Sequence, residues 1–181
     1  MARPTSAARR YAEAAFQLAT RDGTFDAWAK DLATAAELVG DERVARIVSN
    51  PSVARHDRSA TLERLLGKRI SAHALNLIRL LDQRGRLKVL PAIAAEYTRL
   101  LDALRGIVPA TVTSAAPLEK DEVAALAKRL EEMTGGTVKL ATVVEPSLIG
   151  GLTVRVGDRM IDASVRGRLE RLRDQLVAGT R

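Results

Sequence analysis

Few residues in this sequence have the types and spacing that catalysis or metal binding requires. The two histidines, His56 and His73, do not belong to a His-x-x-x-His pattern with a nearby acid, and the lack of cysteine excludes thiolate ligands and disulfides. Their context is typical of ordinary residues at the protein surface or at a helix start. The sequence therefore predicts no metal site and no cofactor.

Two glycine pairs and two aspartates are the remaining candidates for chemistry. Gly135-Gly136 and Gly150-Gly151 are not followed by the Lys-Ser/Thr of a phosphate-binding loop, so a bend before a strand is the simpler interpretation. Asp158 and Asp162 have the right type to act as paired carboxylates, but Asp158 falls in an expected hairpin turn. No nucleophilic side chain has a recognisable base beside it. We therefore predict no catalytic residues.

The composition indicates a helix-rich protein with a basic N-terminal part. The chain has 181 residues, of which 46% are hydrophobic but only 3% aromatic, so Ala, Leu, Val and Ile must fill the core. No apolar run reaches the ~18 residues that a membrane span needs. The formal net charge is +7, and residues 1–105 carry +6 of it. Such an excess suits nucleic acid, an anionic membrane surface or an acidic protein, or simply solvated helix faces.

The N-terminal stretch has some features of a transit peptide. Arg3, Arg9 and Arg10 accompany an Ala-rich amphipathic segment, but Glu13 interrupts the pattern and the helical periodicity continues to Leu18. No apolar segment of the kind found in secretory signals follows the arginines. We therefore expect this stretch to be the first helix of the folded protein.

Residues 1–105 are predicted to form the first domain, a bundle of six helices with short connections. The clearest helical signal is the 3, 4, 3, 4 spacing of apolar residues in the second helix. These are Phe25, Trp28, Leu32, Ala35 and Val39. The first helix has a face of small residues, and the fifth helix, which begins after Ser71, is apolar nearly all round. Such a helix is either central or lends one face to a partner.

A change of periodicity after residue 105 predicts a second domain, residues 106–181, of mixed structure. Strand-like residues 110–113 precede an amphipathic helix over residues 118–134, and a β-branched strand over residues 137–144 follows. Residues 152–156 and 160–162 fit a hairpin around Gly157-Asp158, and a last helix runs over residues 164–177. The predicted fold is therefore mainly α, with an N-terminal six-helix bundle and a small C-terminal β-α-β-hairpin-α domain.

The last helix carries a second apolar stripe with 4, 3, 4 spacing. Its members are Val165, Leu169, Leu172 and Leu176, and four arginines flank them. A stripe of this kind usually packs on the domain's own sheet, so that is our prediction, with a partner helix as the alternative. Because the expected sheet is small, both contacts are compatible with different faces of the helix.

A nucleic-acid-binding protein is the alternative function. A helix-turn-helix within residues 24–66 would present Arg55, Arg58 and Arg64 on its second helix, but Asp57 and Glu63 lie beside them. Aromatic residues are too few for a base-stacking platform. We therefore keep a basic helical nucleic-acid binder only as the second hypothesis.

Three stretches of the sequence resemble one known family. They are residues 8–16 (ARRYAEAAF), residues 76–81 (NLIRLL) with Gly85-Arg86-Leu87, and residues 148–169 (LIGGLTVRVGDRMIDASVRGRL). The family comprises the delta subunits of bacterial and chloroplast F-type ATP synthases, whose mitochondrial counterpart is the oligomycin-sensitivity-conferring protein. The likeness covers essentially the whole chain, and Ala163, where the family often has Gly, is one departure.

The resemblance implies a non-catalytic stator subunit of the peripheral stalk, which links the alpha/beta catalytic head to membrane-anchored b subunits. One copy per complex would lie at the cytoplasmic face of the bacterial plasma membrane, reach the membrane only through the complex, and bind no nucleic acid. By position, the alpha subunit's N-terminal helix would enter a groove formed by seven residues: Tyr11, Ala14, Ala15, Leu18, Leu75, Ile78 and Arg79. Trp28 is a neighbouring candidate, although its spacing fits core packing better. The surface for the C-terminal end of b would include Arg166, Arg168, Leu169 and Leu172.

Overall fold

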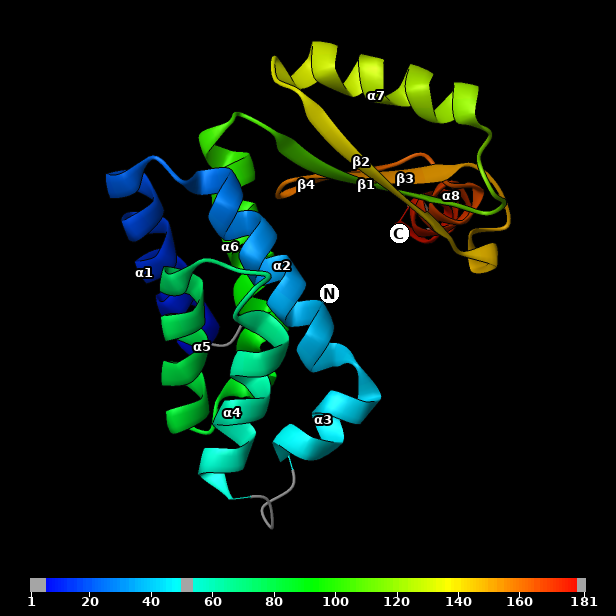
Figure 1. Ribbon diagram of the computed structural model, residues 1–181. Coiled ribbons are helices and arrows are strands. Elements are labelled where there is room, and N and C mark those ends of the chain that lie inside the picture. The colour runs from blue at the N-terminus through cyan, green and yellow to red at the C-terminus, as the bar shows by residue number, and fades with distance from the viewer. Residues whose placement is uncertain (1–5, 50–53, 179–181) are drawn as a thin grey trace. The chain divides into compact units, whose positions relative to one another are not determined.

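The computed structural model describes residues 6–49 and 54–178, and the chain divides into two compact units between Leu101 and Asp102 (Figure 1). In the described residues, the first unit contains only helices, whereas the second contains a four-stranded sheet and two α-helices. This confirms the coarse prediction of a mainly helical protein with a small C-terminal sheet. Within the described ranges, no helix is both long enough and apolar enough to cross a bilayer.

Six α-helices make up the described part of the first unit. They are α1 (Ser6–Asp22), α2 (Phe25–Gly40), α3 (Glu42–Ser49), α4 (Arg55–Leu66), α5 (Ala72–Gln83) and α6 (Leu90–Leu104), with the 3₁₀ helix η1 (Leu87–Val89) before α6. Helix α6 continues three residues past the division between the units. A cut after residue 105 therefore leaves this helix whole.

Small residues on α1 bring this helix close to its neighbours. Ala8, Ala12, Ala15 and Ala19 recur every three or four residues and are all buried. Large side chains from α2, α4, α5 and α6 fill the core of the unit together with this smooth face. They include Trp28 and Leu32 of α2, Ile78 and Leu81 of α5, and Ile93 and Tyr97 of α6. Trp28 thus takes the core position that its spacing favoured, at 3% exposure.

Three of the five aromatic residues of this unit pack together. The Phe16 ring packs between those of Phe25 and Tyr97, with centroid distances of 5.4 and 5.6 Å. The Tyr97 hydroxyl donates a hydrogen bond to the Phe25 carbonyl at 3.1 Å, so the buried oxygen is satisfied. These contacts tie α6 to the first two helices.

Buried carboxylates fix the position of α5. Asp31 of α2 accepts a hydrogen bond from the Ser71 backbone N–H at 2.9 Å, and the Ser71 side chain caps α5 by accepting from Ala74 N. At the other end of the helix, the Arg58 Nε of α4 donates to Asp82 Oδ1 at 2.7 Å, with both side chains largely buried. Helix α5 is therefore held at both ends. These contacts also fix which of its faces points toward the core.

The second unit has the predicted order of elements. Its members are β1 (Val108–Ser114), α7 (Lys120–Thr134), β2 (Val138–Val144), the 3₁₀ helix η2 (Pro146–Leu148), β3 (Leu152–Val156), β4 (Arg159–Asp162) and α8 (Val165–Ala178). The strands lie in the order β2-β1-β3-β4. Strand β1 pairs with β2 in parallel and with β3 antiparallel, and β3 and β4 form the hairpin.

One face of this sheet packs against α7 (Figure 1). Ala110 and Val112 of β1, Val138 of β2 and Val154 of β3 are buried with Leu130 of α7. These strand residues share one face because side chains alternate along a strand and the register aligns them. Helix α7 ends at Gly135, whose φ of +70° is a left-handed conformation that favours glycine.

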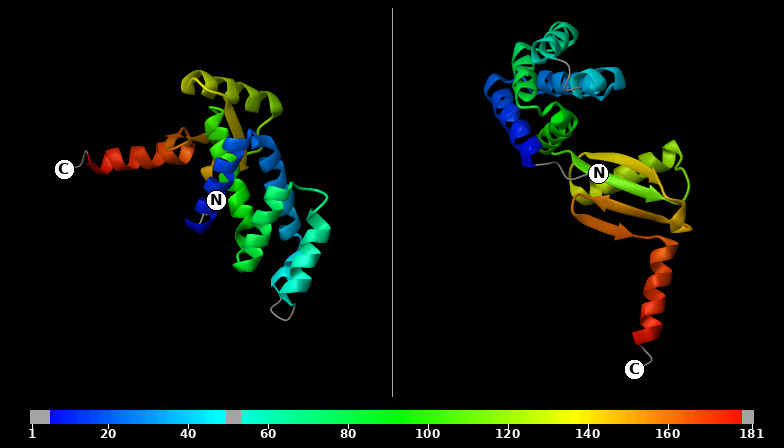
Figure 2. Two further views of the ribbon diagram at one scale, coloured as in Figure 1. Left: turned by 60° about the vertical axis from the view of Figure 1, so that its left-hand side comes forward. Right: turned by 90° about the horizontal axis from the view of Figure 1, so that it is seen from below.

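Helix α8 does not cover the sheet, and the prediction that its apolar stripe packs there is wrong. Val165, Leu169, Leu172 and Leu176 are between 38% and 66% exposed. Figure 2 shows that α8 leaves the end of β4 and projects away from the sheet. The reason is that α7 already occupies the apolar face, while β4 is a short edge strand whose four residues are all exposed.

Candidate partner-binding surfaces

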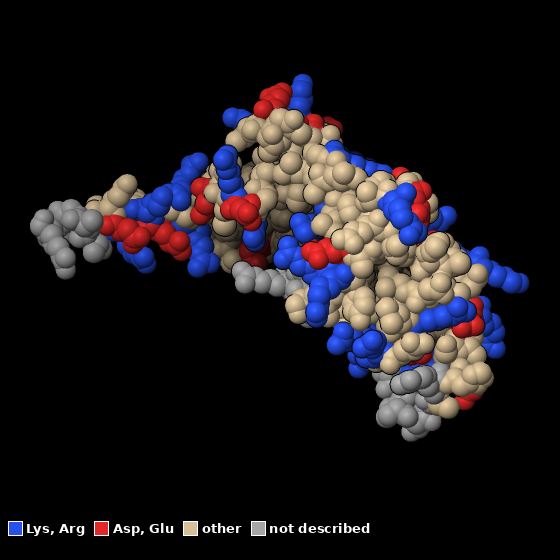
Figure 3. All heavy atoms as spheres, turned by 90° about the vertical axis from the view of Figure 1, so that its left-hand side faces the viewer, with Lys and Arg blue, Asp and Glu red and all other residues tan. Residues whose placement is uncertain are grey.

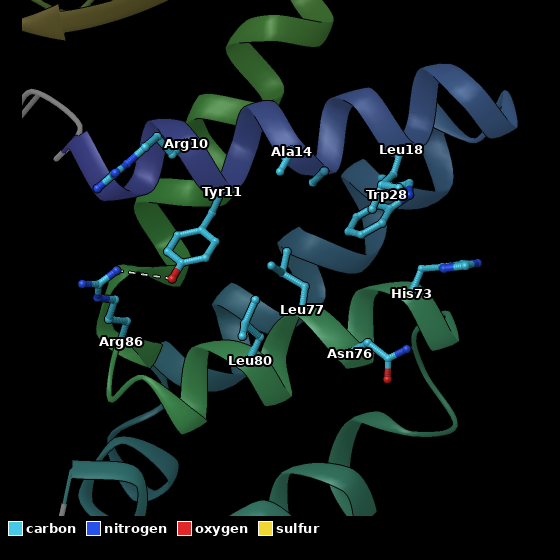
Figure 4. Close-up of a pocket in the computed structure, with 11 residues that line it drawn as sticks. Arg10, Tyr11, Ala14, Leu18, Trp28, His73, Asn76, Leu77, Leu80 and Arg86 are labelled. Carbon is cyan, nitrogen blue, oxygen red and sulfur yellow. Dashed lines mark hydrogen bonds between the residues drawn. The ribbon is translucent and has the colours of Figure 1, made fainter.

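A groove of about 640 Å³ lies between α1 and α5 (Figure 4). Each helix contributes residues at helical spacing, so two stripes border the same hollow. The lining residues are Arg10, Tyr11, Ala14, Ala15 and Leu18 of α1, His73, Asn76, Leu77 and Leu80 of α5, and Trp28 and Arg86. None of the described residues that line the groove is an aspartate or a glutamate.

The middle of the groove is apolar and has exposed side chains along its borders. Ala15 and Trp28 are buried at its base, whereas Leu18 and Leu80 on its borders are each nearly 40% exposed. The alanines of α1 leave room between the two borders, because a methyl group is the only side chain there. An elongated apolar groove with exposed leucines at its borders suits the apolar face of an amphipathic helix.

The structure brings together the four groove residues predicted on α1 but not the three predicted on α5. Ile78 is buried in the core, and Leu75 packs against the same core. The Arg79 Nε donates to Glu63 Oε1 of α4 at 2.8 Å, on the side of α5 that faces α4. The stripe of α5 that borders the groove is instead the one formed by His73, Asn76, Leu77 and Leu80.

Apolar residues nearly all round α5 explain this difference. The buried stripe is Ala74, Ile78 and Leu81, and periodicity alone did not separate it from the neighbouring stripe that contains Leu77 and Leu80. A signal was present, since Asn76 and His73 belong to the same stripe as the two leucines. Polar residues at that spacing indicate a surface in contact with solvent.

The histidines and carboxylates outside the groove form no metal site. Within residues 6–49 and 54–178, no group of three or more His, Asp or Glu side chains is placed to hold a metal ion. His56 lies in a second hollow of about 410 Å³, next to Glu63, Arg79 and Asp82. The acids of this hollow are engaged by arginines, through the Arg58–Asp82 and Arg79–Glu63 ion pairs.

In the second unit, the start of α8 is built around the Asp162 carboxylate. Asp162 Oδ1 accepts hydrogen bonds from the Ser164 hydroxyl at 2.6 Å and from the Ser164 backbone N–H at 2.8 Å. The Ser164 hydroxyl in turn accepts from the Gly167 backbone N–H at 3.0 Å. A Cβ at Gly167 would collide with the Asp162 carboxylate, so a larger residue there would displace this carboxylate from its hydrogen bonds to Ser164.

A second glycine completes this elbow, by which we mean residues 162–167 together with Gly151. Gly151 has a φ of +73°, and a Cβ there would lie 2.5 Å from the Ala163 carbonyl oxygen. The backbone at Gly151, just before β3, therefore lies directly against the backbone at Ala163, just before α8. The elbow sets the direction in which α8 leaves the sheet.

Beyond the elbow, α8 presents the four residues that were predicted to face b. Arg166, Arg168, Leu169 and Leu172 are all exposed. Arg166 Nε lies 3.1 Å from Glu170 Oε1 in an i,i+4 ion pair, and Arg173 pairs with Asp174. The helix thus combines an exposed apolar stripe with flanking charges of both signs.

The comparisons with known proteins identify the family. The sequence model of one protein family, described as the ATP synthase delta (OSCP) subunit, matches residues 7–176 of this chain. The chain belongs to the ATP synthase delta (OSCP) subunit family. The delta subunit of Tolumonas auensis is 38% identical over 176 residues, which cover 97% of this chain and 99% of that protein. The delta subunit of Methylobacillus flagellatus is 38% identical over 172 residues, or 95% and 97% of the two chains.

A solved structure shows the same fold. One chain of the Toxoplasma gondii mitochondrial ATP synthase hexamer superposes with a TM-score of 0.73 and 22% identity, covering 96% of this chain and 98% of that chain. Members of the delta (OSCP) family are structural subunits of the peripheral stalk of F-type ATP synthase. The predicted role as a non-catalytic stator subunit is therefore confirmed, and the nucleic-acid-binding alternative has no support.

The hydrogen bonds of Asp162 in the elbow predict that the local stability of this segment depends on pH. The hydrogen bond from the Ser164 hydroxyl, with that from the Ser164 N–H, holds the pKa of Asp162 below its usual range. A carboxyl whose pKa is lowered by folding stabilises the folded state above its unfolded pKa of about 3.9, and this contribution is lost as the pH falls through the folded-state pKa. Asp162→Asn should therefore weaken protection of the Ser164 and Gly167 amides at neutral pH.

Hydrogen exchange of these two amides, compared between the wild type and Asp162→Asn at each pH, measures this effect. The difference between the two proteins is expected at pH 7 and should shrink as the pH falls below about 4. Asp158→Asn, in the exposed hairpin turn, is the matched control and should leave both amides unchanged. A difference between wild type and Asp162→Asn that stays constant down to acid pH would contradict the assignment.

Proposed function

We propose that the groove between α1 and α5 receives the amphipathic N-terminal helix of an ATP synthase alpha subunit. The observation that carries this proposal is the pair of stripes, one from each helix, that border a single apolar hollow of about 640 Å³. The residues of α5 that take part are His73, Asn76, Leu77 and Leu80, in place of the three predicted from position. Tyr11, Ala14, Ala15 and Leu18 keep the role proposed for α1.

A stator subunit works by binding its partners tightly, not by catalysing a reaction. The rotor turns against the catalytic head, so the head must be held by contacts that outlast many rotation steps. Several apolar anchors at helical spacing, buried in one groove, give slow dissociation. An interface of about 800 Å² per partner is ordinary for such a task.

We propose that the second surface, α8, meets the C-terminal ends of the b subunits. Its exposed stripe of Val165, Leu169, Leu172 and Leu176 suits an apolar face of another helix, and Arg166 and Arg168 beside it suit acidic residues. The two surfaces lie in different units of the chain, as expected of a protein that links two partners. Each complex would hold one copy, at the cytoplasmic face of the bacterial plasma membrane, with the membrane reached only through b.

The distribution of charge agrees with protein partners. On the face drawn in Figure 3, the Lys and Arg side chains are interspersed with Asp and Glu over the helical unit. A nucleic-acid-binding surface typically gathers basic side chains in one patch or stripe. Many arginines here have acidic neighbours, as in the Arg9–Glu13 and Arg99–Glu96 pairs.

A fragment experiment tests the proposed division of labour. Residues 1–105 should fold alone as a six-helix bundle, because their core cluster contains only residues before 102. We expect this fragment to melt cooperatively by circular dichroism and to bind a synthetic alpha N-terminal peptide with the affinity of the full chain. Residues 106–181 should bind the C-terminal segment of b and not the alpha peptide.

The outcomes of the fragment experiment are distinct. An unfolded 1–105 fragment would contradict the proposed boundary. A folded fragment that does not bind the alpha peptide, when the full chain does, would contradict the location of the groove. Calorimetry with the full chain is the reference for both measurements.

A further inference from the structure

One end of the α1–α5 groove differs from the rest. Arg10 and Tyr11 come from the start of α1, and Arg86 comes from the turn between α5 and η1. Figure 4 shows these three side chains at one end of the groove, with Trp28 and His73 toward the other. Two guanidinium groups from distant parts of the sequence therefore lie at the same end of an apolar groove.

Among the described residues, neither guanidinium group is paired with a carboxylate. In the described part of the chain, no carboxylate lies within 4.0 Å of Arg10 or Arg86, and no acid lines the groove. The neighbouring Arg9 behaves differently, since its Nε lies 3.3 Å from Glu13 and 3.9 Å from the buried Glu96. The acids near the start of α1 are thus directed to Arg9, and the groove end keeps its positive charge.

Tyr11 adds a third donor at this end. The Arg86 Nη1 donates a hydrogen bond to the Tyr11 hydroxyl oxygen at 3.3 Å, so the hydroxyl hydrogen remains available for an incoming acceptor. Two guanidinium groups and a phenol in one place match a carboxylate, which only accepts hydrogen bonds. The adjoining apolar wall strengthens such an interaction because it excludes water.

We propose that this end of the groove is a carboxylate-binding subsite, which takes an acidic side chain at one end of the apolar stripe of the bound alpha helix. The proposal rests on the proposed function of the groove and adds to it the direction of the helix. The opposite end, with Trp28 and His73, has no arginine or lysine among its lining residues. A helix with its acid at the wrong end would leave that acid without a partner, so the subsite selects one direction and one register.

Calorimetric titration of the full-length chain with the synthetic alpha N-terminal peptide tests this subsite. Arg10→Gln and Arg86→Gln should each weaken binding by about five- to tenfold at low salt, as expected for loss of a charge-assisted hydrogen bond. Arg84→Gln is the matched control, since Arg84 is exposed two residues away and does not line the groove. It should change the affinity less than twofold, by our rough expectation for a distant exposed charge.

A double-mutant cycle identifies the acid. Each Asp or Glu of the peptide is replaced in turn by its amide, and each peptide is titrated into the wild type and Arg86→Gln. One amide peptide should bind the wild type about as weakly as the original peptide binds Arg86→Gln, and the two changes together should cost little more than one. Thermal melts of every variant check that the fold is intact, as expected for exposed side chains.

Three results would overturn the subsite. If both arginine variants bind like Arg84→Gln, or if no peptide acid couples to Arg86, the groove binds its helix without a carboxylate contact and the proposed function survives. If the wild-type chain does not bind the alpha peptide at all, the proposed function of the groove fails, and the subsite fails with it.

Discussion

Ala14→Lys is expected to lower the affinity for the alpha N-terminal peptide by at least about a hundredfold, because it places an ammonium group in the apolar middle of the groove. Ala14 lines the groove but is exposed in the free protein, so the lysine can extend into solvent until a partner arrives. The melting temperature should therefore change by no more than a few degrees, since lysine is a good helix former. Isothermal calorimetry and a thermal melt measure the two quantities.

Gln17→Lys provides the control for this substitution. Gln17 is also exposed on α1 and also gains a positive charge, but it does not line the groove. We expect its affinity to stay close to that of the wild type. Ala15 is not a suitable test position, because it is 2% exposed and a lysine there would disrupt the core. Unchanged binding by Ala14→Lys would show that the alpha helix binds elsewhere.

Leu172→Glu is expected to reduce binding of the C-terminal segment of b by roughly tenfold to a hundredfold, because it puts a carboxylate in the centre of the α8 stripe. Leu172 is 52% exposed, so the isolated chain loses little buried apolar surface and its melting temperature should hardly change. A large effect on binding with a small effect on stability is the signature of an interface residue. A pull-down with the b segment, followed by calorimetry, provides the measurement.

Gln175→Glu is the matched control on the same helix. It adds the same charge at an exposed position outside the apolar stripe, and we expect near wild-type binding. If Leu172→Glu binds b as well as Gln175→Glu does, α8 is not the surface that meets b. If Leu172→Glu unfolds the second unit, the stripe has a packing role within this chain.

Much of the fold could be predicted because local signals agreed with the tertiary structure. The seam from Phe25 to Val39 predicted α2, and the turn at Gly157-Asp158 predicted the β3–β4 hairpin. The small residues of α1 likewise indicated a helix that others approach closely. In each of these cases the residue types left one structural interpretation.

The groove and the α8 surface were harder to predict from sequence because they depend on how the helices pack in the tertiary structure. Helix α5 offered two adjacent apolar stripes, and only its packing against α2 and α4 decides that Ile78 is fully buried whereas the half-buried Leu77 borders the groove. Arg86 belongs to a turn, and no spacing relates it to Arg10. Whether α7 or α8 covers the sheet depends on which helix reaches the apolar face, and periodicity is similar in both.

The way in which α8 is attached has a mechanical consequence. Helix α8 has 14 residues and, at about 1.5 Å per residue, extends about 21 Å from the elbow. A sideways force on the far end of α8 loads the helix like a beam that is fixed at one end. The bending moment is therefore greatest at the root of the helix, where it joins the elbow. The root is where Ser164 hydrogen-bonds to both Asp162 and Gly167, and where Gly167 lies directly against the Asp162 carboxylate. Stiffness at that root, rather than contact area along the helix, would set how much of the load reaches the sheet.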